Sequence, residues 1–186
     1  MAGPAFLILL LLSLAGYVLN RRAALAIRDG GVRLHSLTRF HALYSALLVT
    51  VPALVLIILW LMLSGAVIDR MVMAGLPPGV LAGLDEGGRQ LVLTEIRTIA
   101  GGRVFGAPAP WKLEAAARMA ELGRLSGWLL LAVSTAMMLA AMAFARARVS
   151  ATFRARQQVE RIVLGIMIFC SLVAIFVTLG IVFSLV

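Results

Sequence analysis

Long uninterrupted apolar blocks dominate the chain, and within them polar residues follow neither the period of a surface helix nor that of a half-buried strand. Four stretches contain no Asp, Glu, Lys or Arg: 1–20, 40–68, 125–145 and 162–186. A helix of about 20 apolar residues crosses the ~30 Å hydrocarbon core of a bilayer and satisfies all its backbone hydrogen bonds internally. The pattern therefore predicts four transmembrane helices, with Pro52 interrupting the second and bending it.

The first stretch has the shortest apolar run, residues 4–19, and that length also suits the core of a signal peptide. A signal peptide places basic residues before its apolar run. Here none precedes the run, and Arg21 and Arg22 follow it directly. We therefore interpret it as a transmembrane helix inserted with its N-terminus outside.

Basic residues gather in two short connections, which defines a topology. Residues 21–39 and residues 146–161 are arginine-rich, whereas residues 69–124 carry seven basic and six acidic residues. Since short arginine-rich loops stay in the cytoplasm, both termini are predicted to lie outside. We expect an all-α integral membrane four-helix bundle with a small helical periplasmic cap: residues 1–66 as helices one and two, 67–124 as the cap, and 125–186 as helices three and four.

The cap segment contains two helical patterns separated by glycine and proline pairs. Residues 89–100 place Val92, Ile96 and Ile99 on one face and stop at Gly101-Gly102, which predicts a short amphipathic helix. A second helix begins at Pro110 and runs into the third span, with Glu114 and Arg118 spaced for an i, i+4 ion pair. Packing on the bundle or on partner subunits is the favoured role of this cap, and a ligand site is the alternative.

Composition agrees with a membrane protein. Of 186 residues 62% are hydrophobic and 13% charged, the mean hydropathy is +1.05 and one cysteine, Cys170, lies in an apolar block. A water-soluble domain carries about 25% charged residues, so this class is excluded. The net charge of +9 arises mostly from the two arginine-rich loops. Topology and anionic lipid head groups account for it, and no nucleic-acid-binding motif accompanies it.

Chemistry-bearing motifs are absent from the sequence. No phosphate-binding glycine loop occurs; His35 and His41 are wrongly spaced for metal ligands and are interpreted as interfacial, and the serines lack triad partners. We predict no enzyme, no cofactor, and no catalytic, substrate-binding, cofactor-binding or metal-binding residue.

The spans themselves lack the ionisable groups, His41 apart, that mark an ion or substrate path. They do carry small-residue stripes that favour close helix packing, at Ala132, Ala136 and Ala140 and at Ser171, Ala174 and Thr178. These features predict a helix-packing role rather than a translocation path.

Two segments resemble the PstC-type permease subunit of the phosphate-specific ATP-binding cassette (ABC) transporter. Residues 159–163 (VERIV) and 178–185 (TLGIVFSL) resemble its opening helix. Residues 37–44 (LTRFHALY), 51–54 (VPAL) and Trp60 resemble the N-terminal membrane extension of a subset of these permeases. Glu114-Ala115-Ala116 matches only the start of the ATPase-coupling signature of such permeases, because position 120 is alanine where the signature has glycine.

The resemblance implies a multi-pass protein of the bacterial inner membrane in a phosphate importer. Its partners would be the lipid bilayer, a second permease subunit, a cytoplasmic ABC ATPase and a periplasmic phosphate-binding protein. The chain would be an accessory, scaffolding module at the N-terminus of the permease, without translocation path or coupling motif, and a fragment of a longer protein. The alternative is a self-contained four-helix inner-membrane protein, an assembly factor or sensor anchor.

Overall fold

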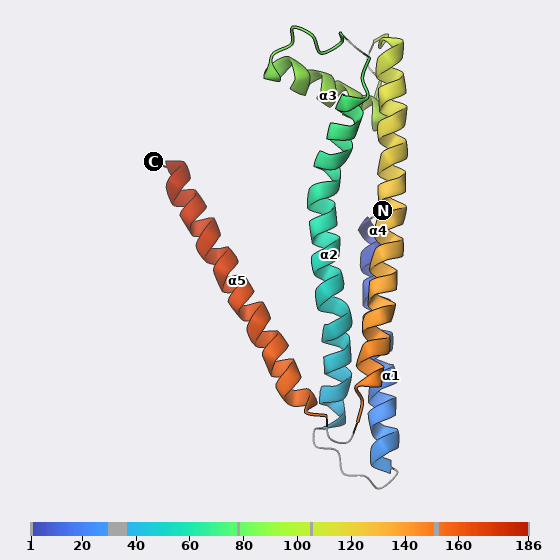
Figure 1. The fold of residues 1–186 in the computed structure, drawn as a ribbon, viewed down its shortest axis with the longest axis vertical. Helices are drawn as coiled ribbons and strands as arrows, with labels where there is room; N and C mark the ends of the chain where they lie inside the picture. The colour runs from blue at the N-terminus through green and yellow to red at the C-terminus, as the bar shows by residue number, and fades with distance from the viewer. Residues whose placement is uncertain (1, 30–36, 78, 105, 151–152, 186) are drawn as a thin grey trace. The chain divides into compact units, whose positions relative to one another are not determined.

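The computed structural model describes residues 2–29, 37–77, 79–104, 106–150 and 153–185, and in these ranges all regular structure is helical (Figure 1). The helices are α1 (Ala2–Asp29), α2 (Thr38–Ala74), α3 (Glu86–Ala100), α4 (Pro110–Ala147) and α5 (Ala155–Leu185). All but α3 are long and apolar enough to cross a membrane. The prediction of an all-α membrane protein with four spanning helices is therefore confirmed.

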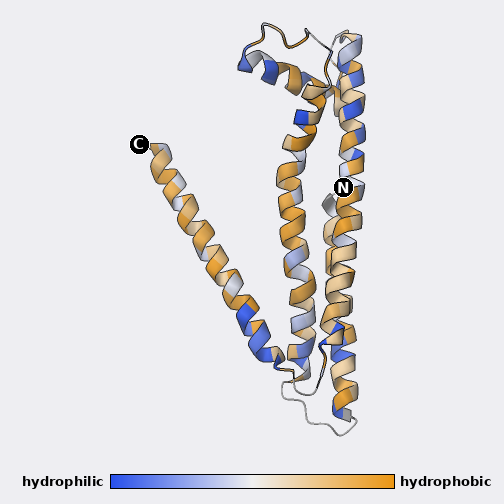
Figure 2. Cartoon of the chain, in the orientation of Figure 1, coloured by the Kyte–Doolittle hydropathy of each residue, from blue (hydrophilic) through white to orange (hydrophobic). Residues whose placement is uncertain are grey.

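The long helices extend beyond the apolar blocks that predicted them. α1 continues past Asn20 through its arginines to Asp29, and α2 continues past Ile68 to Ala74. α4 begins at Pro110 and runs without a break into the third apolar block, as predicted. α2 continues on both sides of Pro52, since a proline inside a membrane helix removes only one backbone donor. Hydrophilic residues concentrate on the end of α1, on α3, on the first part of α4 and at the start of α5 (Figure 2).

The chain divides into two compact units. The first consists of Met1–Leu7 and Leu54–Thr135 and contains the end of α2, all of α3 and most of α4. Its core lies among Val72, Leu93, Ile96, Ala115, Ala116 and Met119. Deeper along the apolar helices, Trp60 Nε1 donates to Ser126 Oγ at 3.0 Å and links α2 to α4.

The second unit consists of Ile8–Ala53 and Ala136–Val186. Tyr44, Ala145 and Val159 form its apolar cluster, and the rings of Tyr44 and Phe153 meet edge to face with centroids 5.1 Å apart. The buried residues of α5, Ala155 and Val159, both lie near its start. Beyond Arg161, α5 is largely exposed and almost wholly apolar, so in a bilayer this part faces lipid or another helix.

Candidate interaction surface: the helical cap

The cap, residues 67–124, is built around α3, whose ends are set by local sequence. Asp85 caps the N-terminus, its Oδ1 accepting from the backbone N–H of Gly88 at 2.8 Å. At the other end Gly102 adopts φ +84°, a left-handed conformation that suits glycine, and its N–H donates to the carbonyl of Ile99 at 2.9 Å. The helix therefore starts three residues before the predicted position 89. Gly87 and Gly88, expected as a break, lie in its capped first turn.

One face of α3 is buried against the end of α2 and the start of α4. Ile96 is fully buried and Leu93 nearly so, beside Val72 of α2 and Met119 of α4. Val92 and Ile99 are partly buried at the edge of the same cluster. The predicted apolar face is confirmed, with Leu93 added. Trp111 packs against this cluster too, so it rests on neighbouring helices.

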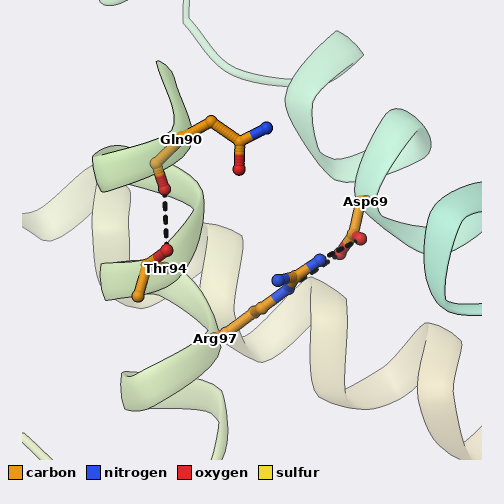
Figure 3. Close-up of polar contacts among 4 residues, drawn as sticks. All are labelled: Asp69, Gln90, Thr94 and Arg97. Atoms are coloured by element: carbon orange, nitrogen blue, oxygen red, sulfur yellow. Dashed lines mark hydrogen bonds and ion pairs between the residues drawn. The ribbon is translucent and has the colours of Figure 1, made fainter. Parts of the chain in front are cut away.

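Two ion pairs hold α3 from either side. Arg97 donates from Nε to Asp69 Oδ1 at 3.2 Å and from Nη2 to Asp69 Oδ2, which ties α3 to α2 (Figure 3). Lys112 Nζ donates to Glu95 Oε2 at 2.6 Å, which ties α4 to α3. The hydrogen bond with Asp69 raises the pKa of Arg97 above its ordinary value, so the guanidinium stays charged. Each exposed ion pair contributes about 0.2–1 kcal/mol to stability. The pairs therefore orient α3, and burial of its apolar face supplies most of the stability of its packing.

The predicted pair of Glu114 with Arg118 is not formed. In the described ranges the ion pairs are Arg97–Asp69, Lys112–Glu95 and Arg156–Glu160. The guanidinium of Arg118 instead lies directly over Gly75 at the end of α2, where the absence of a side chain leaves room for it.

A polar pocket of about 460 Å³ lies between the end of α2 and α3. Arg70 and Arg89 line it without an ion-pair partner in the described chain, whereas Arg97 is neutralised by Asp69. Glu86, Gln90, Ala66, Met73 and Leu93 complete the lining. The pocket therefore presents hydrogen-bond donors with a small excess of positive charge, which suits a carboxylate or another anionic group.

A set of polar contacts inside the second unit was not predicted from the sequence. Asn20 is fully buried, and its Nδ2 donates to Ser45 Oγ at 2.6 Å and to the Gly16 carbonyl at 3.1 Å. Thr50 Oγ1 donates to Ser13 Oγ at 2.7 Å. These bonds join α1 to α2 within their apolar blocks. The sequence indicates these contacts only through the uncharged polar residues that recur inside the apolar blocks of α1 and α2. Attention to ionisable groups alone does not reveal them.

His41, interpreted as an interfacial histidine, is 1% exposed within the chain, and its ring centroid lies 5.8 Å from that of Phe153. His35 lies outside the described residues. The alanine stripe Ala132, Ala136 and Ala140 is exposed within the chain, where α4 buries Leu130, Ser134 and Met138. Ser171, Ala174 and Thr178 are exposed as well. Both small-residue stripes remain unused within the described chain.

Comparison with known proteins identifies the family of this chain. A family model described as "Phosphate ATP-binding cassette transporter" matches residues 6–177, nearly the whole chain. The chain belongs to this phosphate transporter family. The resemblance found in the sequence is thereby confirmed at the level of the family. No curated protein and no solved structure matches the chain.

Membership of the phosphate ATP-binding cassette transporter family places the four apolar helices in a transporter context. The protein is a membrane protein associated with phosphate ABC transport. Within that context, the described spans bury hydroxyl and amide groups and one histidine, His41, but no carboxylate, lysine or arginine.

Proposed function

We propose that the chain is an accessory, scaffolding membrane module of the permease subunit in a bacterial phosphate importer. It spans the inner membrane four times, catalyses nothing itself, and works beside a second permease subunit and a cytoplasmic ABC ATPase. The family supports the transporter context. The absence of charged side chains from the buried faces of the described spans supports a scaffold rather than a translocation path, because a path for the phosphate anion would need cationic partners there.

In this proposal the cap lies in the periplasm and contacts the phosphate-binding protein. The observation that carries the assignment is the polar pocket of the cap, in which Arg70 and Arg89 have no ion-pair partner in the described chain. Its apolar core is already covered by α2, α3 and α4, so its outer face is available for a partner. Unpaired guanidinium groups in a concave site favour acidic side chains of an approaching protein.

The test is made in the complete transporter reconstituted in vesicles. Replacing Arg70→Glu and Arg89→Glu together is expected to lower the stimulation of ATP hydrolysis by phosphate-loaded binding protein about tenfold. Like-charge repulsion of acidic partner groups produces this loss. Basal ATP hydrolysis and the yield of assembled transporter should remain unchanged, because both arginines are exposed and lie outside the apolar core.

Arg103→Glu is the matched control. Arg103 is an exposed cap arginine outside the pocket, so the same charge change there should leave the stimulation close to the wild-type value. If the binding protein stimulates ATP hydrolysis equally in the double variant and in the wild type, the pocket has no role in docking. Loss of basal ATP hydrolysis would contradict the accessory role.

A further inference from the structure

A second concave surface of the first unit is almost purely apolar. It is a groove of about 500 Å³ between α2 and α4, lined by side chains such as Leu63, Val67, Leu122 and Leu129. The polar groups of Trp60 and Ser126 within it are bonded to each other. The groove therefore offers aliphatic and aromatic surface with little unsatisfied polarity.

The length and level of the groove match one leaflet of a bilayer. Its α2 lining runs from Leu56 to Met71, which at 1.5 Å per residue is about 22 Å along the helix. Half of a bilayer with its head groups measures roughly 20–22 Å. The apolar block of α2 ends at Ile68, one turn before Met71. The groove therefore runs from the membrane interior to the surface on the cap side.

A cation lies at the surface end of this groove. Arg118 precedes Leu122 by one helical turn, so both side chains occupy the same face of α4. Its guanidinium lies over Gly75, which directly follows α2 and is four residues beyond Met71. No acidic residue of the described chain pairs with it. An unpaired guanidinium at the membrane surface attracts the phosphate of an anionic lipid.

We propose that this groove is a binding site for one anionic phospholipid. An acyl chain lies along Leu129, Trp60, Leu63 and Val67, and the lipid phosphate accepts hydrogen bonds from the guanidinium of Arg118. The apolar lining selects a hydrocarbon chain, and the charge at the surface end selects an anionic head group over a zwitterionic one. The site is independent of the polar cap pocket, whose arginines lie on α2 and α3.

Fluorescence quenching of Trp60 by brominated lipid tests the proposal. The full chain carrying Trp111→Phe and Trp128→Phe is reconstituted into phosphatidylcholine vesicles with rising fractions of brominated phosphatidylglycerol, or of brominated phosphatidylcholine. Binding of the anionic lipid near Trp60 is expected to be about fivefold stronger, the factor that about 1 kcal/mol per basic residue at an anionic surface corresponds to. Arg118→Gln is expected to reduce this preference to about one.

Arg124→Gln is the matched control, because Arg124 is exposed on the same helix but off the groove-lining face. It should keep the fivefold preference. The proposed site would be contradicted if Arg118→Gln and Arg124→Gln lowered the preference for anionic lipid equally. It would also be contradicted if the chain with Trp60 as its single tryptophan showed no such preference. A Leu63→Cys cross-link to another polypeptide in the intact transporter, in a Cys170→Ser background, would also overturn it, since a protein helix would then fill the groove.

Discussion

Asn20 shows what a polar side chain needs when its helix is surrounded by apolar groups. It is fully buried, and its amide nitrogen reaches both Ser45 Oγ on α2 and the Gly16 carbonyl on its own helix. Gly16 makes this approach possible: a Cβ atom there would lie 3.1 Å from Ser45 Oγ. Because lipid offers no hydrogen-bond partner, such contacts select one register of α1 against α2.

We predict that Asn20 and Ser45 are energetically coupled. A double-mutant cycle with Asn20→Leu and Ser45→Ala should give a coupling of about 0.6 kcal/mol and at most ~1.7 kcal/mol, the range for hydrogen bonds between membrane helices. The free energy of unfolding in mixed detergent micelles measures it. Thr178→Val is the control, because the Thr178 hydroxyl donates to Ala174 within its own helix. Strictly additive effects would show that the bond does not orient the two helices.

At the scale of an element, α3 depends on its neighbours. A 15-residue helix is marginal in isolation, and this one is polar around most of its circumference, with a single apolar stripe. The sequence predicted the stripe because apolar residues recur at helical spacing. The predicted start of α3 was wrong, because Asp85 caps the helix and its first turn contains Gly87 and Gly88, residues that are typical of a turn. The ion pairs could not be predicted from the sequence, because Asp69 and Glu95 each pair with a residue on another helix.

We predict that Ile96 controls the docking of α3. Ile96→Ala removes a fully buried side chain and should lower stability by about 2–5 kcal/mol. Amide hydrogen exchange over residues 86–100 should then accelerate, while the exchange of the membrane parts of α2 and α4 stays slow. Leu91→Ala is the control on the same helix, because Leu91 is 73% exposed, and its effect should stay within ~0.5 kcal/mol. Equal acceleration in both variants would contradict docking through Ile96.

At the scale of the whole molecule, the proposed function depends on which side of the membrane each connection faces. Both connections that carry the arginine clusters join long apolar helices, whereas the cap carries nearly balanced charge. Insertion keeps short arginine-rich loops in the cytoplasm, because moving guanidinium groups across the hydrocarbon is costly. The proposed topology therefore has a periplasmic cap, which would be able to meet a phosphate-binding protein.

We predict opposite accessibility of two introduced cysteines in a Cys170→Ser background. An impermeant maleimide should label Leu91→Cys in the cap of intact spheroplasts. It should label Arg154→Cys only after the membrane is permeabilised. Both original side chains are exposed, so neither position is protected by packing within the chain. Labelling of Arg154→Cys in intact spheroplasts would contradict the predicted topology and, with it, the proposed docking of the cap in the periplasm.

The order of apolar and polar residues was enough to define the four spans and the amphipathic stripe of the cap helix, because each of these elements depends on a single continuous segment. The family was recognised from the residues of two such segments. Contacts between segments became known only from the folded chain. Folding brought Asn20 to Ser45, Arg97 to Asp69 and Arg118 over Gly75, and it buried Leu130, Ser134 and Met138 of α4 rather than the alanine stripe. The physical reason is that a span is defined by its hydrophobicity against lipid, whereas the face that it buries depends on shapes and hydrogen bonds supplied by distant parts of the chain.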